Sequence, residues 1–396
     1  MKDFDVIVAG GGLVGAAAAL GLAQAGHRVA VIEAAARRAN HQPSYDDRTL
    51  VVNAASLNIL SGLGLLPAEL TRMPVREIRI TRAGGFGTLQ LKAEQHQREF
   101  FGAVIVAREL GNVMLDALPA QSGITELCPA RLETFTVETD HVRVRLGDGT
   151  LIRGRLLIGS DGTHSMVRQS AGIESAHHDY GQSAMIFNVR PASAPAGVAW
   201  ERFTPRGPLA LLPQPEGRLG VVWIDRSEAI DEAMSWEDHE LIARLDRRFG
   251  PSLGGFNSPG ARARYPLVRQ RTRRPIAERV AVIGNAANSV HPVSAQGFNL
   301  GLRDAASLIE TLQGSGDPGS PETLEAYARS RYPDQEATVR YTDTLARAFT
   351  NPSLLARFGA GLGLAAHAAV PGLSRRLVRS AMGFRDPVTR LARGNR

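Results

Sequence analysis

The sequence predicts an α/β fold built around a parallel sheet with helices on its faces. Three strand–turn–helix units predict it. In each unit a short apolar strand runs directly into a polar, glycine-containing turn that leads into a helix; the strands lie at 5–9, 156–158 and 280–283. Short, wholly apolar strands that alternate with helices are typical of parallel sheets covered on both faces.

The composition supports a multidomain globular protein. The 396 residues suffice for two or three domains of about 150 residues each. The chain is 43% hydrophobic and 21% charged, which excludes a disordered, collagen-like or coiled-coil chain. Because Cys128 is the only cysteine, an intramolecular disulfide and a cysteine-rich metal site are excluded, and we predict no metal site.

The termini and the charge distribution limit location and partners. No apolar run reaches the roughly 18 residues of a membrane-spanning helix, and residues 1–5 lack the features of a signal peptide. We therefore expect a cytoplasmic protein. Of the net charge of +7, residues 374–396 carry +6, from seven Arg and one Asp. The rest of the chain is nearly neutral, which excludes nucleic-acid binding through a global basic face.

The first unit carries a dinucleotide-binding pattern. The strand at 5–9 is followed by Gly10-x-Gly12-x-x-Gly15, a helix over 16–25 and a second strand over 28–32 that ends in Glu33. Gly10 allows the tight turn, Gly12 lets the backbone approach a pyrophosphate, and Gly15 lets helix and strand pack closely. The helix N-terminus stabilises phosphate charge, and Glu33 accepts hydrogen bonds from ribose hydroxyls. The motif alone leaves FAD and NAD as alternatives.

Two later motifs extend the pattern. A buried strand ends in Asp161-Gly162 and enters a helix that contains Arg168; a strand–turn–helix without a ligand is the alternative interpretation. The strand ending at Gly284 is followed by a polar loop and by a helix that begins near Gly297. The free backbone N–H groups of that helix end suit the flavin edge that becomes negative on reduction.

In this order and spacing, the three motifs resemble those of the group A FAD-dependent aromatic hydroxylases, which have the para-hydroxybenzoate hydroxylase fold. The resemblance covers about residues 5–350 and extends to the branch that hydroxylates ubiquinone precursors, with most similarity to the 2-polyprenyl-6-methoxyphenol hydroxylases. The segments that carry this finer resemblance are 44–50, 201–204, 207–213, 265–267 and 291–301.

The resemblance implies a discontinuous domain arrangement. A Rossmann-like FAD-binding domain of the GR2 type would comprise residues 1–75, 98–180 and 274–340. An inserted α+β substrate domain on a mixed sheet would comprise 76–97 and 181–273, where strand-like segments occur at 184–189, 209–212 and 219–225. Residues 341–396 would form a helical, basic C-terminal tail.

The resemblance also implies cofactor-binding positions beyond the first motif. Arg48 would lie near the FAD phosphates or the flavin, and Asp161 near the pyrophosphate. Arg108 and Asn112 would line the FAD ribityl or phosphate groups. The alternatives are a solvated loop for Arg48 and a surface helix face for Arg108 and Asn112. The other implied positions are Gly284, Asn285, Pro292, Gln296, Gly297, Phe298 and Asn299.

The chain departs from the wider family at two places. Asn285 stands where Asp is usual, and Leu50-Val51-Val52-Asn53 replaces the commoner Ala-Ile-Ala-Leu after Arg48. These departures bear on the substrate rather than on the cofactor. His291 is either a core histidine or a proton-transfer group, and no catalytic residue is assigned.

The family chemistry implies a function. NAD(P)H reduces FAD transiently, and O₂ then gives a flavin C4a-hydroperoxide that hydroxylates the ring of a polyprenylated phenol. The alternatives are a hydroxylase of a soluble aromatic, an FAD reductase acting on prenyl chains, or an FAD-binding accessory subunit of a ubiquinone-synthesising complex.

The C-terminal region raises a separate question. Residues 354–373 are apolar but rich in glycine, and the Arg-rich segment 374–396 follows. One interpretation is a capping helix with a frayed end. The other is an element that docks at an anionic membrane surface, where each Arg contributes about 1 kcal/mol, or on a partner of the ubiquinone-biosynthesis complex.

Overall fold

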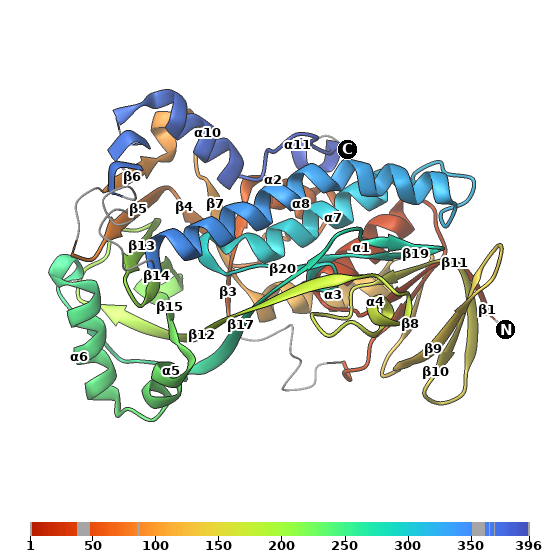
Figure 1. Cartoon of the computed structure of the whole chain (residues 1–396), viewed down its shortest axis with the longest axis horizontal. Helices are drawn as coiled ribbons and strands as arrows, with labels where there is room; N and C mark the ends of the chain where they lie inside the picture. Colours follow the sequence, from red (N-terminus) through yellow and green to blue (C-terminus); the bar gives the residue numbers. More distant parts are fainter. Residues whose placement is uncertain are drawn as a thin grey trace.

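The computed structural model describes residues 2–37, 48–84, 88–350, 361–363, 365–367 and 369–394. Its strands form two large mixed sheets and one small sheet of three strands (Figure 1). The long strands β12 (Ser175–Pro191) and β17 (Ala263–Thr272) and the helices α7 (Gln296–Leu312) and α8 (Pro321–Thr350) extend from one large sheet toward the other (Figure 1). The α/β fold expected from the sequence is confirmed.

The first large sheet contains the glycine-rich motif. In spatial order, its main strands are β18 (Ile276–Ala277), β19 (Val280–Val282), β11 (Leu151–Gly159), β1 (Lys2–Ala9), β2 (Val29–Ile32) and β8 (Ile124–Leu127). The pairs from β19 to β8 are all parallel. The hairpin of β9 (Leu132–Val137) and β10 (Val142–Leu146) extends β11 on an antiparallel edge.

Helices cover this sheet through small, apolar contacts. The helices α1 (Leu13–Gln24), α2 (Ala54–Gly62), α3 (Ala107–Ala120) and α7 (Gln296–Leu312) contribute to one core with the strands. A Cβ on Gly21 of α1 would lie 2.2 Å from Cδ1 of Ile309 in α7. The run of alanine and glycine in α1 therefore lets two helices approach each other closely.

The second large sheet is mostly antiparallel. Its order is β20 (Asn288–Ser289), β17 (Ala263–Thr272), β12 (Ser175–Pro191), β15 (Leu219–Arg226), β14 (Gly207–Pro213), β13 (Val198–Thr204), β5 (Glu77–Arg82) and β6 (Leu89–Lys92), with β16 (Phe256–Asn257) beside β12. The strand-like segments expected at 184–189, 209–212 and 219–225 lie within β12, β14 and β15. One face packs against α5 (Ser227–Met234) and α6 (Asp238–Phe249).

Short elements join the two sheets. The third sheet consists of β3 (Thr49–Asn53), β7 (Gly102–Val106) and β4 (Met73–Val75). The strand β12 begins at Ser175, before the predicted boundary at 181, and β20 pairs with β17 from beyond the boundary at 274. The exact division of the chain into domains stays a prediction.

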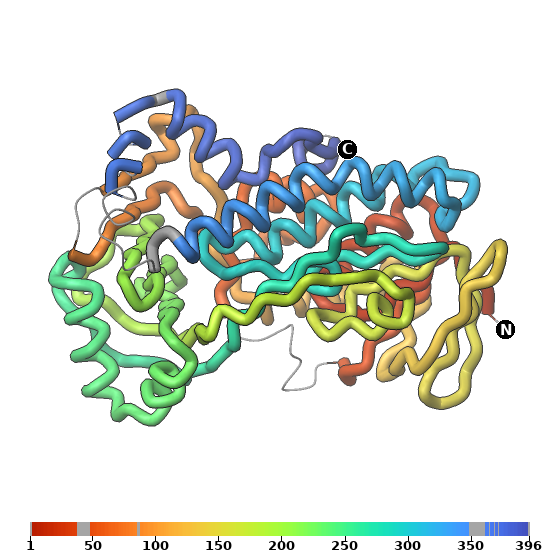
Figure 2. Tube along the Cα trace, in the orientation of Figure 1, coloured from red at the N-terminus to blue at the C-terminus, as the bar shows by residue number. Residues whose placement is uncertain are grey.

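The C-terminal region packs on the first sheet's helices. The helix α8 (Pro321–Thr350) runs along α7, and α10 (Pro371–Ala381) and α11 (Arg390–Arg393) follow. Asn58 Nδ2 donates to the Ala392 carbonyl at 2.8 Å, and Ala55 N donates to the Met382 carbonyl at 3.0 Å. The tube in Figure 2 shows this segment returning to the red and orange N-terminal part.

Residues 381–394, for which a frayed end is one interpretation of the sequence, are instead docked on the protein. The apolar stretch that begins at 354 lies outside the described residues until 361. Among the helices that the structure describes, none is both long and apolar enough to span a membrane.

Candidate FAD-binding site

The three motifs meet at one edge of the first sheet. The strands β19, β11 and β1 are adjacent and parallel, so the turns that follow them lie side by side. Ser160 Oγ donates to the Gly10 carbonyl at 2.7 Å, which joins the second turn to the first. Arg168, a buried side chain, donates from Nη1 to the Ala286 carbonyl at 3.0 Å, which joins the second turn to the third. Ligands of open α/β sheets bind at this carboxyl edge.

The glycines are required by close backbone contacts. Gly10 has φ of +101°, and a Cβ there would lie 2.6 Å from the Ser160 carbonyl oxygen. A Cβ on Gly15 would lie 2.0 Å from the Gly10 carbonyl oxygen. Gly12 is the N-cap residue of α1 and has no side chain to cover the helix end. The N-terminus of α1 is thus open to an anionic ligand.

Glu33 lies at the end of β2, across the glycine turn. Its Oε2 accepts a hydrogen bond from Gly11 N at 2.7 Å, and its Oε1 accepts one from Ala35 N at 2.8 Å. These bonds fix the carboxylate beside the turn. The arrangement is consistent with the predicted binding of ribose hydroxyls.

Asp161 has one engaged and one unpartnered oxygen. Its Oδ2 accepts hydrogen bonds from Met166 N at 2.8 Å and Val167 N at 3.2 Å, at the start of α4 (Met166–Ser170). Its Oδ1 is buried, and no partner for it occurs among the described residues. Since a buried carboxylate oxygen without a partner is costly, this atom fits a site that a bound hydroxyl or water completes.

The third motif packs directly on α1. Gly284 has φ of +59° and begins the single turn η4 (Gly284–Ala286), and a Cβ on Gly301 would lie 2.8 Å from Cγ2 of Val14. Asn285 is the exposed middle residue of this turn. The close packing brings the N-terminus of α7 toward that of α1. Two helix ends then point toward one region, which suits a ligand with several negative groups.

The loop before α7 holds an unusual backbone. Pro292 precedes the turn η5 (Val293–Ala295), in which Ser294 has φ of 66° and Ala295 has φ of 49°. Left-handed conformations in non-glycine residues cost energy and cluster at binding sites. Gly297 and Phe298, both partly exposed, occupy the first turn of α7.

Two predicted residues of this loop differ in what their side chains contact. The Asn299 side chain is used within the protein: Oδ1 accepts from Asn53 N at 2.9 Å, and Nδ2 donates to the carbonyls of Val51 and Ala295. Asn299 therefore joins α7 to β3 and can position the loop. Gln296 is buried, and its Oε1 has no partner among the described residues.

The remaining predicted residues lie around the start of α3. The Arg48 guanidinium lies 4.9 Å from the centroid of the Tyr265 ring, and its carbonyl accepts from Ala107 N at 2.9 Å. Arg108 and Asn112 lie on the exposed face of α3. Positions 44–47 of the motif before Arg48 lie outside the described residues. The roles of these three residues stay predictions.

His291 is a buried, neutral side chain. Val293 N donates to its Nδ1 at 3.2 Å, the Tyr180 ring stands edge-on with its centroid 5.0 Å away, and burial lowers the His291 pKa to about 4. This environment favours the core histidine over the proton-transfer group.

The residues that the sequence analysis did not assign to the site are Ser160 and Arg168. Their signal was a hydroxyl and a basic residue within the second motif.

The turns after β1, β11 and β19, together with Glu33 and Asp161, form a cradle at this edge of the sheet. The cradle fits FAD, because it offers glycine turns for a pyrophosphate, the fixed Glu33 carboxylate for a ribose, and an unpartnered acceptor on Asp161. A family model described as an FAD binding domain matches residues 3–342. The chain is 36% identical over 389 residues to the ubiquinone hydroxylase UbiL of Rhodospirillum rubrum, which covers 96% of this chain and 90% of that protein. It is 32% identical over 389 residues to the 3-demethoxyubiquinol 3-hydroxylase of Escherichia coli, which covers 96% and 98%.

Solved structures show the same fold. PqsL of Pseudomonas aeruginosa, a probable FAD-dependent monooxygenase, aligns with a TM-score of 0.76 at 24% identity and covers 92% of this chain and 99% of its own. The p-nitrophenol 4-monooxygenase PnpA of Pseudomonas putida aligns with a TM-score of 0.76 at 18% identity, over 97% and 100%. The chain therefore belongs to the family with this FAD binding domain, in the branch that contains the ubiquinone hydroxylases, and its cofactor is FAD.

Proposed function

We propose that this protein is an FAD-dependent monooxygenase that uses NAD(P)H and O₂ to hydroxylate the aromatic ring of a polyprenylated phenol in ubiquinone biosynthesis. The observation that carries this proposal is the similarity, over 96% of the chain, to a ubiquinone hydroxylase at 36% identity and to a 3-demethoxyubiquinol 3-hydroxylase at 32% identity. The cradle of three turns supports the cofactor. Overall, one oxygen atom of O₂ enters the ring, and the other leaves as water with the two electrons of NAD(P)H.

The residues of the chain provide binding and orientation. Gly10, Gly12 and Gly15 admit the pyrophosphate to the N-terminus of α1, and Glu33 receives the adenosine ribose. Asp161 and the first turn of α7 would hold the central part and the flavin edge of the cofactor. When bound, FAD accepts hydride from NAD(P)H and activates O₂; the protein orients the phenol ring and excludes water.

The test is an assay of the purified protein. We expect a flavin absorbance spectrum, NAD(P)H oxidation in air that a prenylated methoxyphenol stimulates, and a product about 16 Da heavier, from one added oxygen atom. The ring position follows from fragmentation of the product. Turnover of a soluble phenol alone would favour the soluble aromatic. Bound FAD without substrate-stimulated oxidation would favour the accessory subunit.

We further propose that α10 and the segment before it dock on an anionic membrane surface. Leu362, Val370 and Leu373 are 49%, 46% and 41% exposed; Leu362 precedes α10, Val370 is its N-cap residue, and Leu373 lies in its first turn. Arg375, Arg376 and Arg379 of α10 are exposed as well. Apolar side chains beside several arginines suit insertion between anionic lipid headgroups, where a prenylated substrate resides.

A further inference from the structure

One acidic side chain points from the second sheet toward the cofactor-binding part. Along β13, Trp200 packs with α5 and α6, so its neighbours in the strand point to the opposite face. On that face, Phe203 belongs to the same apolar cluster as Val293 of the loop before α7, and Glu201 lies two residues before Phe203. A charged residue at an inward position of an otherwise apolar strand requires an explanation.

Glu201 is deep in the protein without a compensating cation. Its side chain retains partial exposure, yet burial alone raises its pKa to about 7. Directly opposite it in the sheet are Ile80 of β5 and Ala210 of β14, which are apolar. Arg202, the next residue, is turned elsewhere and donates to the Arg248 carbonyl at 3.0 Å. A side chain that lies deep in the protein and is still partly exposed, as Glu201 is, is expected on the wall of a substrate site.

Tyr341 and Ser294 join Glu201 to the cofactor loop. Tyr341 lies on α8 one turn before Leu345, which belongs to the same apolar cluster as Phe203 and Val293. It interacts there with Ser294, one of the two strained residues before α7. Burial raises the Tyr341 pKa, the Ser294 bond and the Arg385 charge lower it, and the Glu201 charge raises it. Glu201, Tyr341 and Ser294 therefore form one cluster between β13, α8 and the loop.

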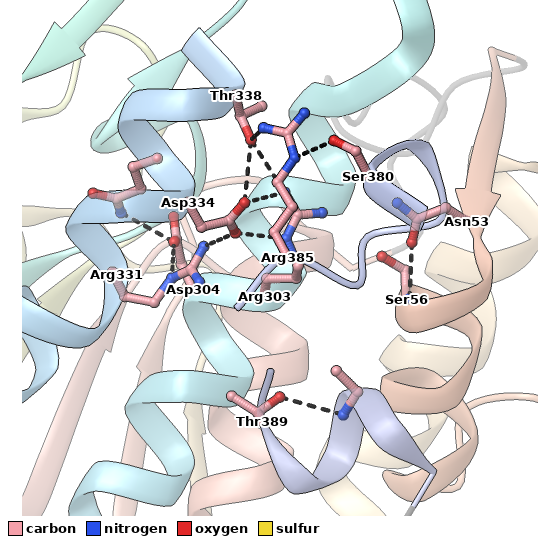
Figure 3. A network of polar contacts seen from close by, with 12 residues as sticks. Asn53, Ser56, Arg303, Asp304, Arg331, Asp334, Thr338, Ser380, Arg385 and Thr389 are labelled. Atoms are coloured by element: carbon pink, nitrogen blue, oxygen red, sulfur yellow. Dashed lines mark hydrogen bonds and ion pairs between the residues drawn. The ribbon is translucent and has the colours of Figure 1, made fainter. Parts of the chain in front are cut away.

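Arg385 supplies the fourth side of this cluster. Its guanidinium lies 5.6 Å from the centroid of the Tyr341 ring, and Nη1 donates to Thr338 Oγ1 at 3.1 Å. Figure 3 shows Arg385 reaching from the C-terminal segment to Thr338 on α8 and Ser380. Arg385, which the sequence analysis placed in a basic tail, thus lies against Tyr341 of α8. Among the described residues, Tyr341 is thus the titratable group that interacts with Glu201, and Arg385 contacts the Tyr341 ring.

We propose that Glu201 accepts the proton of the substrate's phenolic hydroxyl, and that Tyr341, held by Ser294 and Arg385, is a positioning residue for that phenol. This inference rests on the proposed function. In the step, the O–H bond breaks and the proton passes to a carboxylate oxygen, which leaves the electron pair on the phenolate. The phenolate ring is the stronger nucleophile toward oxygen. When aromaticity returns, the ring carbon releases its proton to water and the phenolic oxygen regains one from Glu201.

The other candidate for this role is less suitable. His291 has a low pKa, and its Nδ1 already accepts from the backbone, so it is a weak base in this position. A carboxyl group with a pKa near 7 is about half ionised at neutral pH, which is the range in which general bases work best. Glu201 therefore has both the location and the proton affinity for the step.

The test compares Glu201→Gln with Glu228→Gln, the same change at an exposed position of α5 on the opposite side of the sheet. In the wild type we expect kcat/KM to rise with pH through a midpoint near 7. Glu201→Gln should lower it by 10²-fold or more and remove this rise, while Glu228→Gln should change neither. Glu201→Asp should restore the pH-dependent rise.

A second measurement does not depend on turnover. In the oxidised holoenzyme without NAD(P)H, the ultraviolet difference spectrum of a bound phenol shows whether it is ionised. Ionisation that depends on Glu201, and that shifts in Tyr341→Phe, supports the proposal. An unchanged ionisation curve in a folded Glu201→Gln variant would overturn it. If the wild type adds no oxygen, the proposed function fails, while this spectrum still decides the role of Glu201.

Discussion

Asp161 combines a helix-capping role with the cofactor-binding role that we propose for it, and a neighbouring residue allows these two roles to be separated. Asp161 Oδ2 caps α4, as does Ser165 Oγ, which accepts from Arg168 N at 2.9 Å. Replacing either residue by Ala should therefore cost about 1 kcal/mol of stability. Only Asp161→Ala also removes the buried Oδ1, which has no partner among the described residues.

We expect Asp161→Ala to weaken FAD binding by roughly tenfold to a hundredfold, the range for losing a hydrogen bond to a charged group. Ser165→Ala should leave the affinity for FAD nearly unchanged. Fluorescence titration of the apoprotein with FAD gives both affinities, and thermal unfolding gives both stabilities. Equal losses of affinity in the two variants would mean that Asp161 acts only through the helix cap.

Single residues also show what the sequence could and could not predict. The close contacts of Gly10 and Gly15 follow from the motif, because its spacing fixes the turn geometry that only glycine permits. The engagement of Asn299 with Asn53 and Val51 could not be predicted, since it joins positions about 250 residues apart. Glu201 belonged to a recognised segment, but its inward direction required the register of β13.

The contact between α7 and α8 depends on a buried ionic network. Asp334 of α8 accepts from Arg303 Nε of α7 and from Arg331 Nη2, each at 2.7 Å, and Arg331 Nε donates to Asp304 at 2.7 Å. All four side chains are at most 5% exposed (Figure 3). A buried network is strongly destabilised when one partner is removed, because the opposite charge remains buried.

Asp334→Ala should accordingly lower the free energy of unfolding by about 3–5 kcal/mol. The matched control is Asp140→Ala, since Asp140 forms an exposed pair with His141 and its loss should change stability by less than about 1 kcal/mol. Chemical denaturation of both variants measures the difference. Similar small losses in the two would show that the network contributes little.

The same network predicts a pH dependence. Burial alone would raise the Asp334 pKa, but the Arg303 and Arg331 charges outweigh it and hold the pKa well below its usual range. A depressed carboxyl pKa contributes stability above the unfolded-state value near 4, and this contribution is lost as pH falls below it. The wild type should therefore lose more stability between pH 5 and 2 than Asp334→Asn does. Urea unfolding at each pH measures the free energy of unfolding of both proteins. If that free energy falls with pH by the same amount in the wild type and in Asp334→Asn, the prediction is contradicted.

The elements differ in how far sequence patterns define them. The helix expected over 16–25 occurs at Leu13–Gln24, and the strand–turn–helix units occur where the apolar runs and glycines place them. The two ends of the 17-residue strand β12 could not be predicted from the sequence, because its partners β15 and β17 pair with different parts of it. Long-range pairing, rather than local propensity, sets its ends.

At the scale of the whole molecule, the C-terminal region has two parts with different surroundings. Residues 381–394 pack on α2 and α7, where Asn58 and Glu310 bind their backbone. The helix α10 precedes them and exposes Arg375, Arg376 and Arg379. Sequence composition identified the charge but not this division, since packing of the last residues depends on positions far away in the chain.

The docked segment orients α10, so the proposed membrane contact can be tested without unfolding it. We expect the protein to sediment with vesicles of anionic phospholipid and not with neutral ones, and binding to fall as salt increases. Arg375→Glu/Arg376→Glu reverses two charges and should reduce binding at least tenfold, at about 1 kcal/mol for each Arg. The control Arg131→Glu/Arg329→Glu makes the same change at exposed positions outside α10 and should bind as the wild type does. Because we expect the exposed apolar side chains of α10 to insert into the bilayer, Leu373→Ser should weaken binding at all salt concentrations. Equal binding by the two double variants would mean that net charge, and not α10, attracts the protein to the bilayer.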